Sequence, residues 1–128
     1  MLFRSNKMKL VINKCYGGFS LSERAIELYF KKKGMNLVIE TDSRFGLKHY
    51  YINEVSDDNY FYDRDLERDD PILVEVVEEL GEDAEGDYAQ LKIVEIPDDV
   101  KWIVEEYDGN EWIAEVHRTL VKIGRAHV

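Results

Sequence analysis

The first pattern along the chain is an alternation of apolar and polar residues from Met8 to Lys14. Leu10 and Ile12 fall on one side of an extended segment, and Val11 falls on the other. A period of two residues predicts a β-strand. Gly17 and Gly18 follow shortly afterwards, so the chain is expected to bend there.

A helical period follows this bend. Between Glu23 and Lys33 the apolar residues form a wide stripe, and Ser22 before them is a favoured N-cap. Lysines in the last turn complement the helix dipole, and Gly34 is expected to end the helix. Two strands are predicted after it, from Asn36 to Glu40 and from Leu47 to Val55, with a polar turn between them.

The middle of the chain combines an irregular polar segment, Ser56 to Asp65, with a second predicted helix. Asp70 followed by Pro71 predicts the start of that helix, and Gly81 predicts its end. Its apolar residues fall on one face and its glutamates on the other. Three further strands are predicted at Tyr88 to Ile96, Lys101 to Tyr107 and Glu111 to His117, and a turn at Asp108, Gly109 and Asn110 joins the last two.

The order β-α-β-β-α-β-β-β predicts an α+β fold, in which a mostly antiparallel sheet carries two helices on one side. The 128 residues, of which 45% are apolar, are enough for one domain with a core and too few for two. We expect a small single domain over residues 1 to 121. Residues 122 to 128 are expected to be non-native, because Ile123 to Val128 matches the translation of a common sequencing adapter and Lys122 fits the codon leading into it.

The charge balance narrows the range of partners. Seventeen basic residues oppose 27 acidic ones, for a formal net charge of -10. Such a charge repels nucleic acid backbones and anionic membranes, so neither non-specific nucleic-acid binding nor membrane binding is expected. The single cysteine cannot form an internal disulfide, and no apolar stretch is long enough for a signal peptide or a membrane span. These features predict a cytoplasmic protein.

The segment from Val11 to Ser22 is the clearest functional signal, because two glycines join a predicted strand to a capped helix. Glycines let the backbone approach a ligand closely, and amides at a helix start attract phosphate or carboxylate. The backbone of Gly17, Gly18 and Phe19 is therefore a candidate phosphate contact. Candidate cations are Lys14, Arg24, Arg64, Arg68 and Arg118, and candidate rings for stacking on a base are Tyr16, Phe19, Tyr60 and Tyr62. The alternative is a tight turn with Phe19 in the core.

Signals for catalysis and metal binding are weaker. Cys15 could pair with His49 or His117, but a lone cysteine ending a core strand is typical of a small buried residue. The acidic residues between Asp63 and Glu67 alternate as in a calcium loop, yet Arg68 stands where that loop needs glycine. The histidines lack the spacing of zinc ligands. The sequence predicts no metal, cofactor or catalytic residue and favours a protein without enzymatic activity.

Two tryptophans flank the predicted hairpin. We expect Trp102 and Trp112 to meet across it or to pack beneath the helices, as core or subunit contacts. An exposed sheet edge with aromatics nearby would also suit a homo-oligomer.

Four blocks of the sequence resemble a family of short proteins encoded by tailed bacteriophages. The blocks are Val11 to Ser22, Glu78 to Gly81, Leu91 to Val100 and Glu105 to Thr119. Members of that family usually carry glycine where this chain has Ser20 and tryptophan where it has Leu120. The resemblance implies a phage accessory protein in the cytoplasm of the infected bacterial host, and it implies no activity.

Two functions fit these features. The preferred one is a counter-defence protein that sequesters a small anionic ligand, such as a host nucleotide immune signal, without chemistry. The other is inhibition of a host protein by an acidic surface that mimics nucleic acid, carried by the second helix or by the acidic residues Asp57, Asp58, Asp63, Asp65, Glu67, Asp69 and Asp70. Arg64 and Arg68 interrupt that acidic run, and a charged surface is common in small domains.

Overall fold

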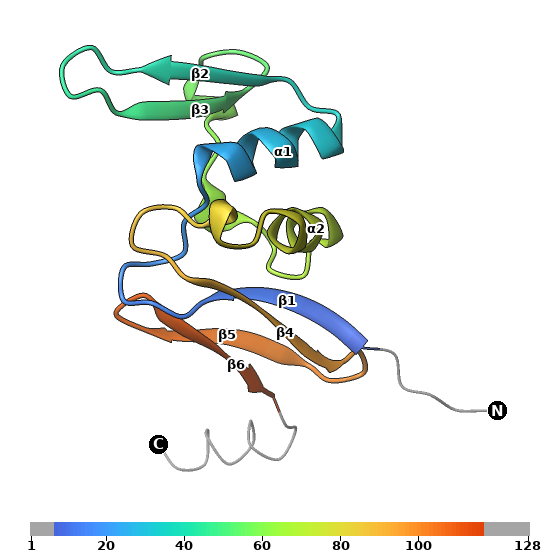
Figure 1. The fold of residues 1–128 in the computed structure, drawn as a ribbon. Coiled ribbons are helices and arrows are strands. Elements are labelled where there is room, and N and C mark those ends of the chain that lie inside the picture. The colour runs from blue at the N-terminus through green and yellow to red at the C-terminus, as the bar shows by residue number, and fades with distance from the viewer. Residues whose placement is uncertain (1–6, 117–128) are drawn as a thin grey trace.

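The computed structural model describes residues 7–116, which contain two α-helices and six strands (Figure 1). In chain order these are β1 (Lys7–Asn13), α1 (Glu23–Lys33), β2 (Leu37–Thr41), β3 (Lys48–Ile52), α2 (Pro71–Leu80), β4 (Leu91–Pro97), β5 (Trp102–Tyr107) and β6 (Asn110–Glu115). Short 3-10 helices lie at η1 (Asp57–Asn59), η2 (Asp63–Asp65) and η3 (Gly81–Ala84). The predicted α+β class and the predicted order are confirmed. The tail at 122 to 128 lies outside the described residues.

The six strands of residues 7–116 form three antiparallel ribbons, β1 with β4, β2 with β3 and β5 with β6. Helices α1 and α2 lie between the β2–β3 ribbon and the β1–β4 ribbon, and β5–β6 lies beyond β1–β4 (Figure 1). A two-stranded ribbon is marginal alone in water. Each ribbon is therefore stabilised by the layer packed on it.

The helix boundaries follow the predicted caps. The Ser22 hydroxyl accepts a hydrogen bond from the Ala25 amide at 3.1 Å, and Gly34 ends α1 at a φ of 71°. At the start of α2 the Asp70 carboxylate accepts from the Ile72 amide at 2.9 Å. The ends of both helices are therefore set by neighbouring residues in the sequence.

The main core lies between the two helices and extends to β1. Phe30, Leu73 and Val76 are fully buried there, and Phe61 packs edge-on against Phe30 with ring centroids 4.9 Å apart. Val11 is the residue of β1 that joins this cluster. The helices thus cover one face of the β1–β4 ribbon.

The other face of that ribbon points toward the β5–β6 hairpin. Leu10 and Ile12 alternate with Val11 and are also buried, and the register sets Leu10 opposite Val94. β1 is therefore apolar on both faces, as expected for a strand between two layers.

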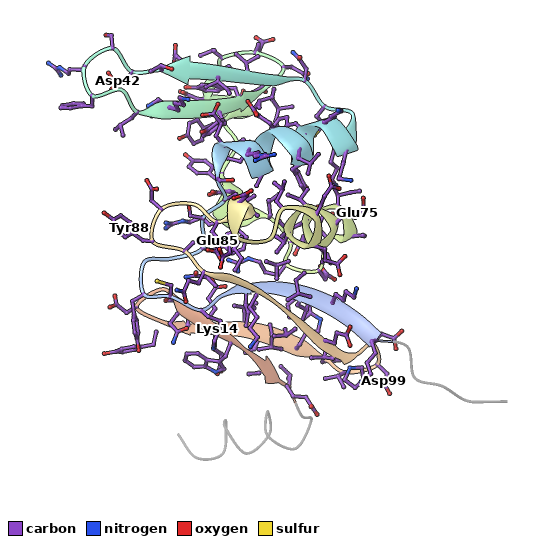
Figure 2. All side chains as sticks on the ribbon, viewed as in Figure 1. Lys14, Asp42, Glu75, Glu85, Tyr88 and Asp99 are labelled. Atoms are coloured by element: carbon purple, nitrogen blue, oxygen red, sulfur yellow. The ribbon has the colours of Figure 1, made fainter. Side chains whose placement is uncertain are left out.

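In the last third of the chain, one predicted strand boundary is wrong, and so is one of the two alternatives for the tryptophans. β4 begins at Leu91 and not at Tyr88, which has a φ of 65° and projects into solvent with 81% of its surface exposed (Figure 2). Trp102 and Trp112 do not meet across the hairpin, because the register pairs Trp102 with Glu115 and Trp112 with Glu105. This offset puts the two indoles on opposite faces.

Acid is expected to weaken the fold partly through Asp70. Burial alone would raise the pKa of this carboxyl, but hydrogen bonds from the Tyr29 hydroxyl at 2.5 Å and the Ile72 amide, with the Lys33 ion pair at 3.3 Å, lower it below its ordinary value. As the pH falls, the Asp70 carboxylate is therefore protonated in the unfolded chain before it is protonated in the folded protein. The stabilisation is full above the ordinary carboxyl pKa and is lost as the pH falls through the folded pKa.

Urea unfolding of the parent and of Asp70→Asn, near pH 6 and near pH 3, measures this effect. We expect the parent to be more stable by about 1 to 2 kcal/mol near pH 6, from the charge-assisted hydrogen bond of Tyr29 and the ion pair with Lys33, and by less near pH 3. Asparagine keeps the cap of α2, because its side-chain oxygen can still accept from the Ile72 amide. A difference that stays constant between the two pH values would contradict the role of the Asp70 charge.

Candidate functional site

The two glycines of the predicted bend lie against other parts of the same chain. A Cβ on Gly17 would be 2.5 Å from the Tyr88 carbonyl oxygen, and a Cβ on Gly109, in the β5–β6 turn, would be 2.4 Å from the Gly18 amide nitrogen. The glycines therefore allow a close approach of two backbones, whereas the sequence predicts the approach of a ligand. The neighbour in this structure is the chain itself.

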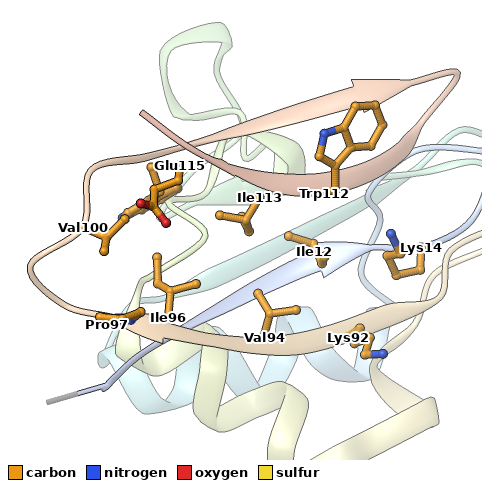
Figure 3. Close-up of a pocket in the computed structure, with 11 residues that line it drawn as sticks. Ile12, Lys14, Lys92, Val94, Ile96, Pro97, Val100, Trp112, Ile113 and Glu115 are labelled. Carbon is orange, nitrogen blue, oxygen red and sulfur yellow. The ribbon is translucent and has the colours of Figure 1, made fainter. Parts of the chain in front are cut away.

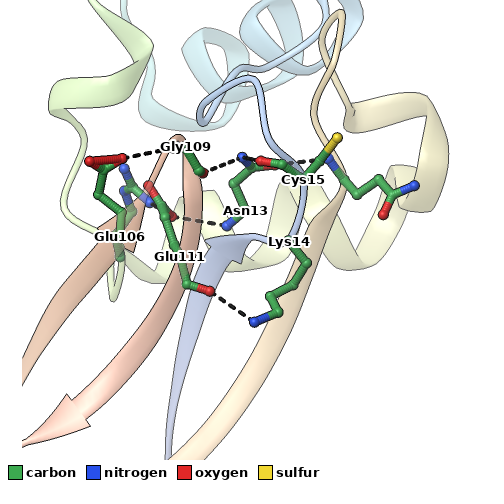
Figure 4. A network of polar contacts seen from close by, with 8 residues as sticks. Asn13, Lys14, Cys15, Glu106, Gly109 and Glu111 are labelled. Carbon is green, nitrogen blue, oxygen red and sulfur yellow. Dashed lines mark hydrogen bonds and ion pairs between the residues drawn. The ribbon is translucent and has the colours of Figure 1, made fainter.

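Asn13, at the end of β1, ties the bend to the hairpin turn (Figure 4). Its amide nitrogen Nδ2 donates to the carbonyls of Cys15 and Gly109, each at 2.7 Å, and its Oδ1 accepts from the Gln90 amide at 2.9 Å. Its backbone amide donates to Oε1 of Glu111 at 2.9 Å. Every polar group of this buried side chain thus has a partner in the fold.

Arg68 and Phe19 complete the same network. Arg68 forms an ion pair with Glu111, and the two side chains are only 12% and 7% exposed. The Arg68 guanidinium carbon also lies 3.8 Å from the centroid of the Phe19 ring. Phe19 is 2% exposed, so its ring is a core residue and presents no open face for a base.

The two residues before α1 bind a carboxylate and a carbonyl of the same chain. The Leu21 amide, just before the helix, donates to Oδ2 of Asp63 at 2.9 Å, and the Ser22 amide donates to the Ala84 carbonyl at 2.9 Å. Arg24 pairs with Asp83 at 3.5 Å on the surface. A carboxylate of the protein therefore binds an amide just before the helix, two residues after the predicted phosphate contacts at Gly17, Gly18 and Phe19.

The remaining predicted site residues are divided between two places. Tyr16 is exposed in the bend, and a nitrogen of Arg64 lies 3.4 Å from where a Gly18 Cβ would be. Tyr60 and Tyr62 instead pack on each other beside β3, with ring centroids 4.4 Å apart. Arg118 lies outside the described residues.

A groove of about 390 Å³ opens on the other side of β1, between the β1–β4 ribbon and the β5–β6 hairpin (Figure 3). The side chains of Ile12, Val94, Ile96 and Ile113 point toward one another across it, whereas the ring of Trp112 turns away. The remaining lining residues are Lys14, Lys92, Pro97, Val100, Trp102 and Glu115. The groove is thus apolar along its length.

Two lysines lie together at one end of this groove, and Glu115 lies at the other (Figure 3). The register sets Ile12 opposite Lys92, so Lys14, two residues beyond Ile12, is a diagonal neighbour of Lys92 on the same face. Nζ of Lys14 donates to the Glu111 carbonyl at 3.0 Å, and Lys92 has no ion pair within residues 7–116. Lys14 is among the residues predicted from the sequence, but Lys92 is not, because its position depends on this long-range register.

Within residues 7–116, no three side chains of the His, Cys, Asp and Glu types are grouped closely enough to hold a metal ion. No helix in that range has the length and apolar character needed to cross a membrane. Comparison of the chain with protein-family models, curated proteins and solved structures finds no match.

Proposed function

We propose that this chain is a phage accessory protein that binds and sequesters a small anionic ligand in the groove between β1–β4 and β5–β6, without transforming it. The observation that carries the proposal is an apolar groove with two lysines at one mouth. A ligand with an apolar or aromatic body and a phosphate or carboxylate group fits this distribution, and a nucleotide is such a ligand.

The size and lining of the groove suit the body of such a ligand. Its 390 Å³ lies at the lower end of the range of about 300 to 1,000 Å³ for small-molecule sites. Ile12, Val94 and Ile113 provide flat aliphatic contacts for a planar ring. Burial of that ring would supply most of the binding energy.

The lysine pair suits the anionic group. Each ammonium has three donors, so Lys14 can bind an anion and keep its bond to the Glu111 carbonyl. Because the chain carries a net charge of -10, an anion is attracted only where cations are concentrated. Binding is therefore expected to depend on both lysines.

The polar lining of the groove favours binding over catalysis. Among the described lining residues, the ionisable groups are those of Lys14, Lys92 and Glu115, and none of the lining residues is histidine, cysteine, serine or threonine. This set lacks a nucleophile with an activating base. The resemblance to bacteriophage proteins supports a host nucleotide immune signal as the ligand, held in the cytoplasm of the infected bacterium.

Calorimetry with cyclic dinucleotides and ADP-ribose derivatives tests the proposal. We expect binding of at least one of these compounds, and Lys92→Ala should weaken it by about tenfold, which corresponds to about 1.4 kcal/mol. Lys31→Ala removes an exposed lysine from α1 and is the matched control, with no expected change. Chromatography should show that the bound compound is unaltered.

Three outcomes would contradict the proposal. They are the absence of binding heat for every compound, conversion of the ligand to a product, and an affinity that Lys92→Ala leaves unchanged while Arg64→Ala abolishes it. The last result would place the ligand at the glycine bend.

A further inference from the structure

Four aromatic side chains form a continuous surface beside β3, which we call the tyrosine surface: His49, Tyr51, Tyr60 and Tyr62. Tyr60 is at its centre, with ring centroids 4.4 Å from Tyr62, 5.3 Å from Tyr51 and 6.0 Å from His49. The Tyr60 hydroxyl and Nδ1 of His49 are 3.2 Å apart. These contacts hold the rings in fixed relative positions.

The alternation of the chain explains why these rings face outward. Residues 60 to 62 are extended and run along β3, where the Phe61 amide donates to the Tyr50 carbonyl at 2.8 Å. Phe61 points into the core. Its neighbours Tyr60 and Tyr62 therefore point the other way. The core is already filled by Phe61, so the two tyrosines are not needed for it.

A hollow of about 220 Å³ adjoins this surface. It is lined by Tyr60 and Tyr62 and also by Ser20, Leu21, Ile26, Lys48, Tyr50, Phe61 and Asp63. Tyr62 is 57% exposed at its rim. An exposed ring beside partly exposed rings and a hollow can receive side chains of a bound peptide.

Carboxylates lie near the Tyr51 edge of the tyrosine surface. The Tyr51 hydroxyl donates to Glu40 at 3.4 Å. Asp57 and Asp58 lie in the first turn of η1, which ends just before Tyr60. Desolvation raises the pKa of Tyr51, and the charges of Glu40 and Asp57 raise it further. This surface therefore favours a cationic partner.

We propose that the tyrosine surface binds an extended, proline-containing peptide segment that carries arginine or lysine. Tyrosine rings in a row accept proline side chains, and a polyproline II segment loses little conformational entropy on binding. The carboxylates select its basic residues. This surface lies on a different ribbon from the groove of β1–β4 and β5–β6, so it would give the protein a second, independent partner.

The probe is a short synthetic peptide with two Pro-x-x-Pro repeats and flanking arginines, titrated into the full chain and followed by amide NMR. We expect shifts confined to the tyrosine surface and to the 220 Å³ hollow. Tyr62→Ala should weaken binding by about tenfold or more, as for an aromatic hot spot. Tyr62→Phe should retain most of the affinity because it keeps the ring.

Tyr107→Ala is the matched control, since it removes an exposed tyrosine from the β5–β6 hairpin and should leave the affinity unchanged. Asp57→Asn combined with Asp58→Asn should lower the affinity severalfold and reduce its dependence on salt. The proposal is overturned if the peptide causes no shifts, or if Tyr62→Ala binds as tightly as the parent. It is also overturned if a peptide with the prolines replaced by alanine binds equally well, or if the surface proves to be buried in a dimer of this chain.

Discussion

Arg68→Met is expected to lower the free energy of unfolding by about 3 to 5 kcal/mol, the usual cost of leaving one member of a buried ion pair without its partner. The remaining charge would be the Glu111 carboxylate, whose side chain is 7% exposed. The substitution also removes the guanidinium from the face of Phe19. The bend and the hairpin turn both depend on this network, so both should loosen.

Urea unfolding of Arg68→Met, Glu111→Leu and the double variant measures this effect. The double variant should be less destabilised than the sum of the single variants, because neither charge is then left buried alone. Arg24→Met is the control, since Arg24 pairs with Asp83 on the exposed surface and should matter little. If Arg68→Met cost no more than Arg24→Met, the buried network would not hold the bend.

Gly109→Ala is expected to lower the free energy of unfolding by about 2 to 4 kcal/mol. The loss combines the strain of a left-handed backbone with an overpacked contact. Gly109 has a φ of 91°, and its added Cβ would lie 2.4 Å from the Gly18 amide nitrogen and 2.8 Å from that of Gly17. Both neighbours are backbone atoms. The clash can therefore be relieved only by moving the bend away from the turn.

Gly46→Ala separates the two causes. Gly46 has a φ of 70°, but nothing lies within 4 Å of an added Cβ. Gly46→Ala should therefore lower the free energy of unfolding by about 1 to 2 kcal/mol, from the backbone conformation alone. Equal thermal and urea stabilities of Gly46→Ala and Gly109→Ala would show that the close approach of the two backbones carries no energy.

The parts of the fold set by neighbouring residues could be predicted from the sequence. Ser22 and Gly34 bound α1, and Asp70 with Pro71 starts α2, as expected from capping chemistry. The Asp108 and Gly109 turn also follows, because both residues adopt the positive φ that a tight hairpin requires.

The buried network could not be predicted, because its members are far apart in the chain. Glu111 is 43 positions from Arg68 and 98 positions from Asn13. Nothing near Glu111 in the sequence distinguishes it from the other hairpin glutamates, which are solvated. Only the docking of β6 beside β1 removes it from water.

The same limit applies to the candidate site. The pair Gly17 and Gly18 predicted that the backbone approaches a ligand, but a glycine gives no information on whether the neighbour is a ligand or another turn of the chain. Lys92 joins Lys14 only through the β1–β4 register. The groove therefore could not be located before the strands were paired.

The acidic residues also divide into two groups that the sequence does not separate. Asp63 accepts from the Leu21 amide and Asp70 caps α2, so both stabilise the fold. Asp57 and Asp58 are exposed in η1, beside the tyrosine surface. The second group supports an acidic interaction surface smaller than the whole run.

Methyl and amide NMR during titration with a cyclic dinucleotide tests the central claim most directly, because it reports the groove and the bend at once. The account predicts shifts at the methyl groups of Ile12, Val94 and Ile113, with the amides of Gly17 and Gly18 unchanged. Shifts at those two amides, without shifts at the methyl groups of the groove, would contradict the account and would place the ligand at the bend.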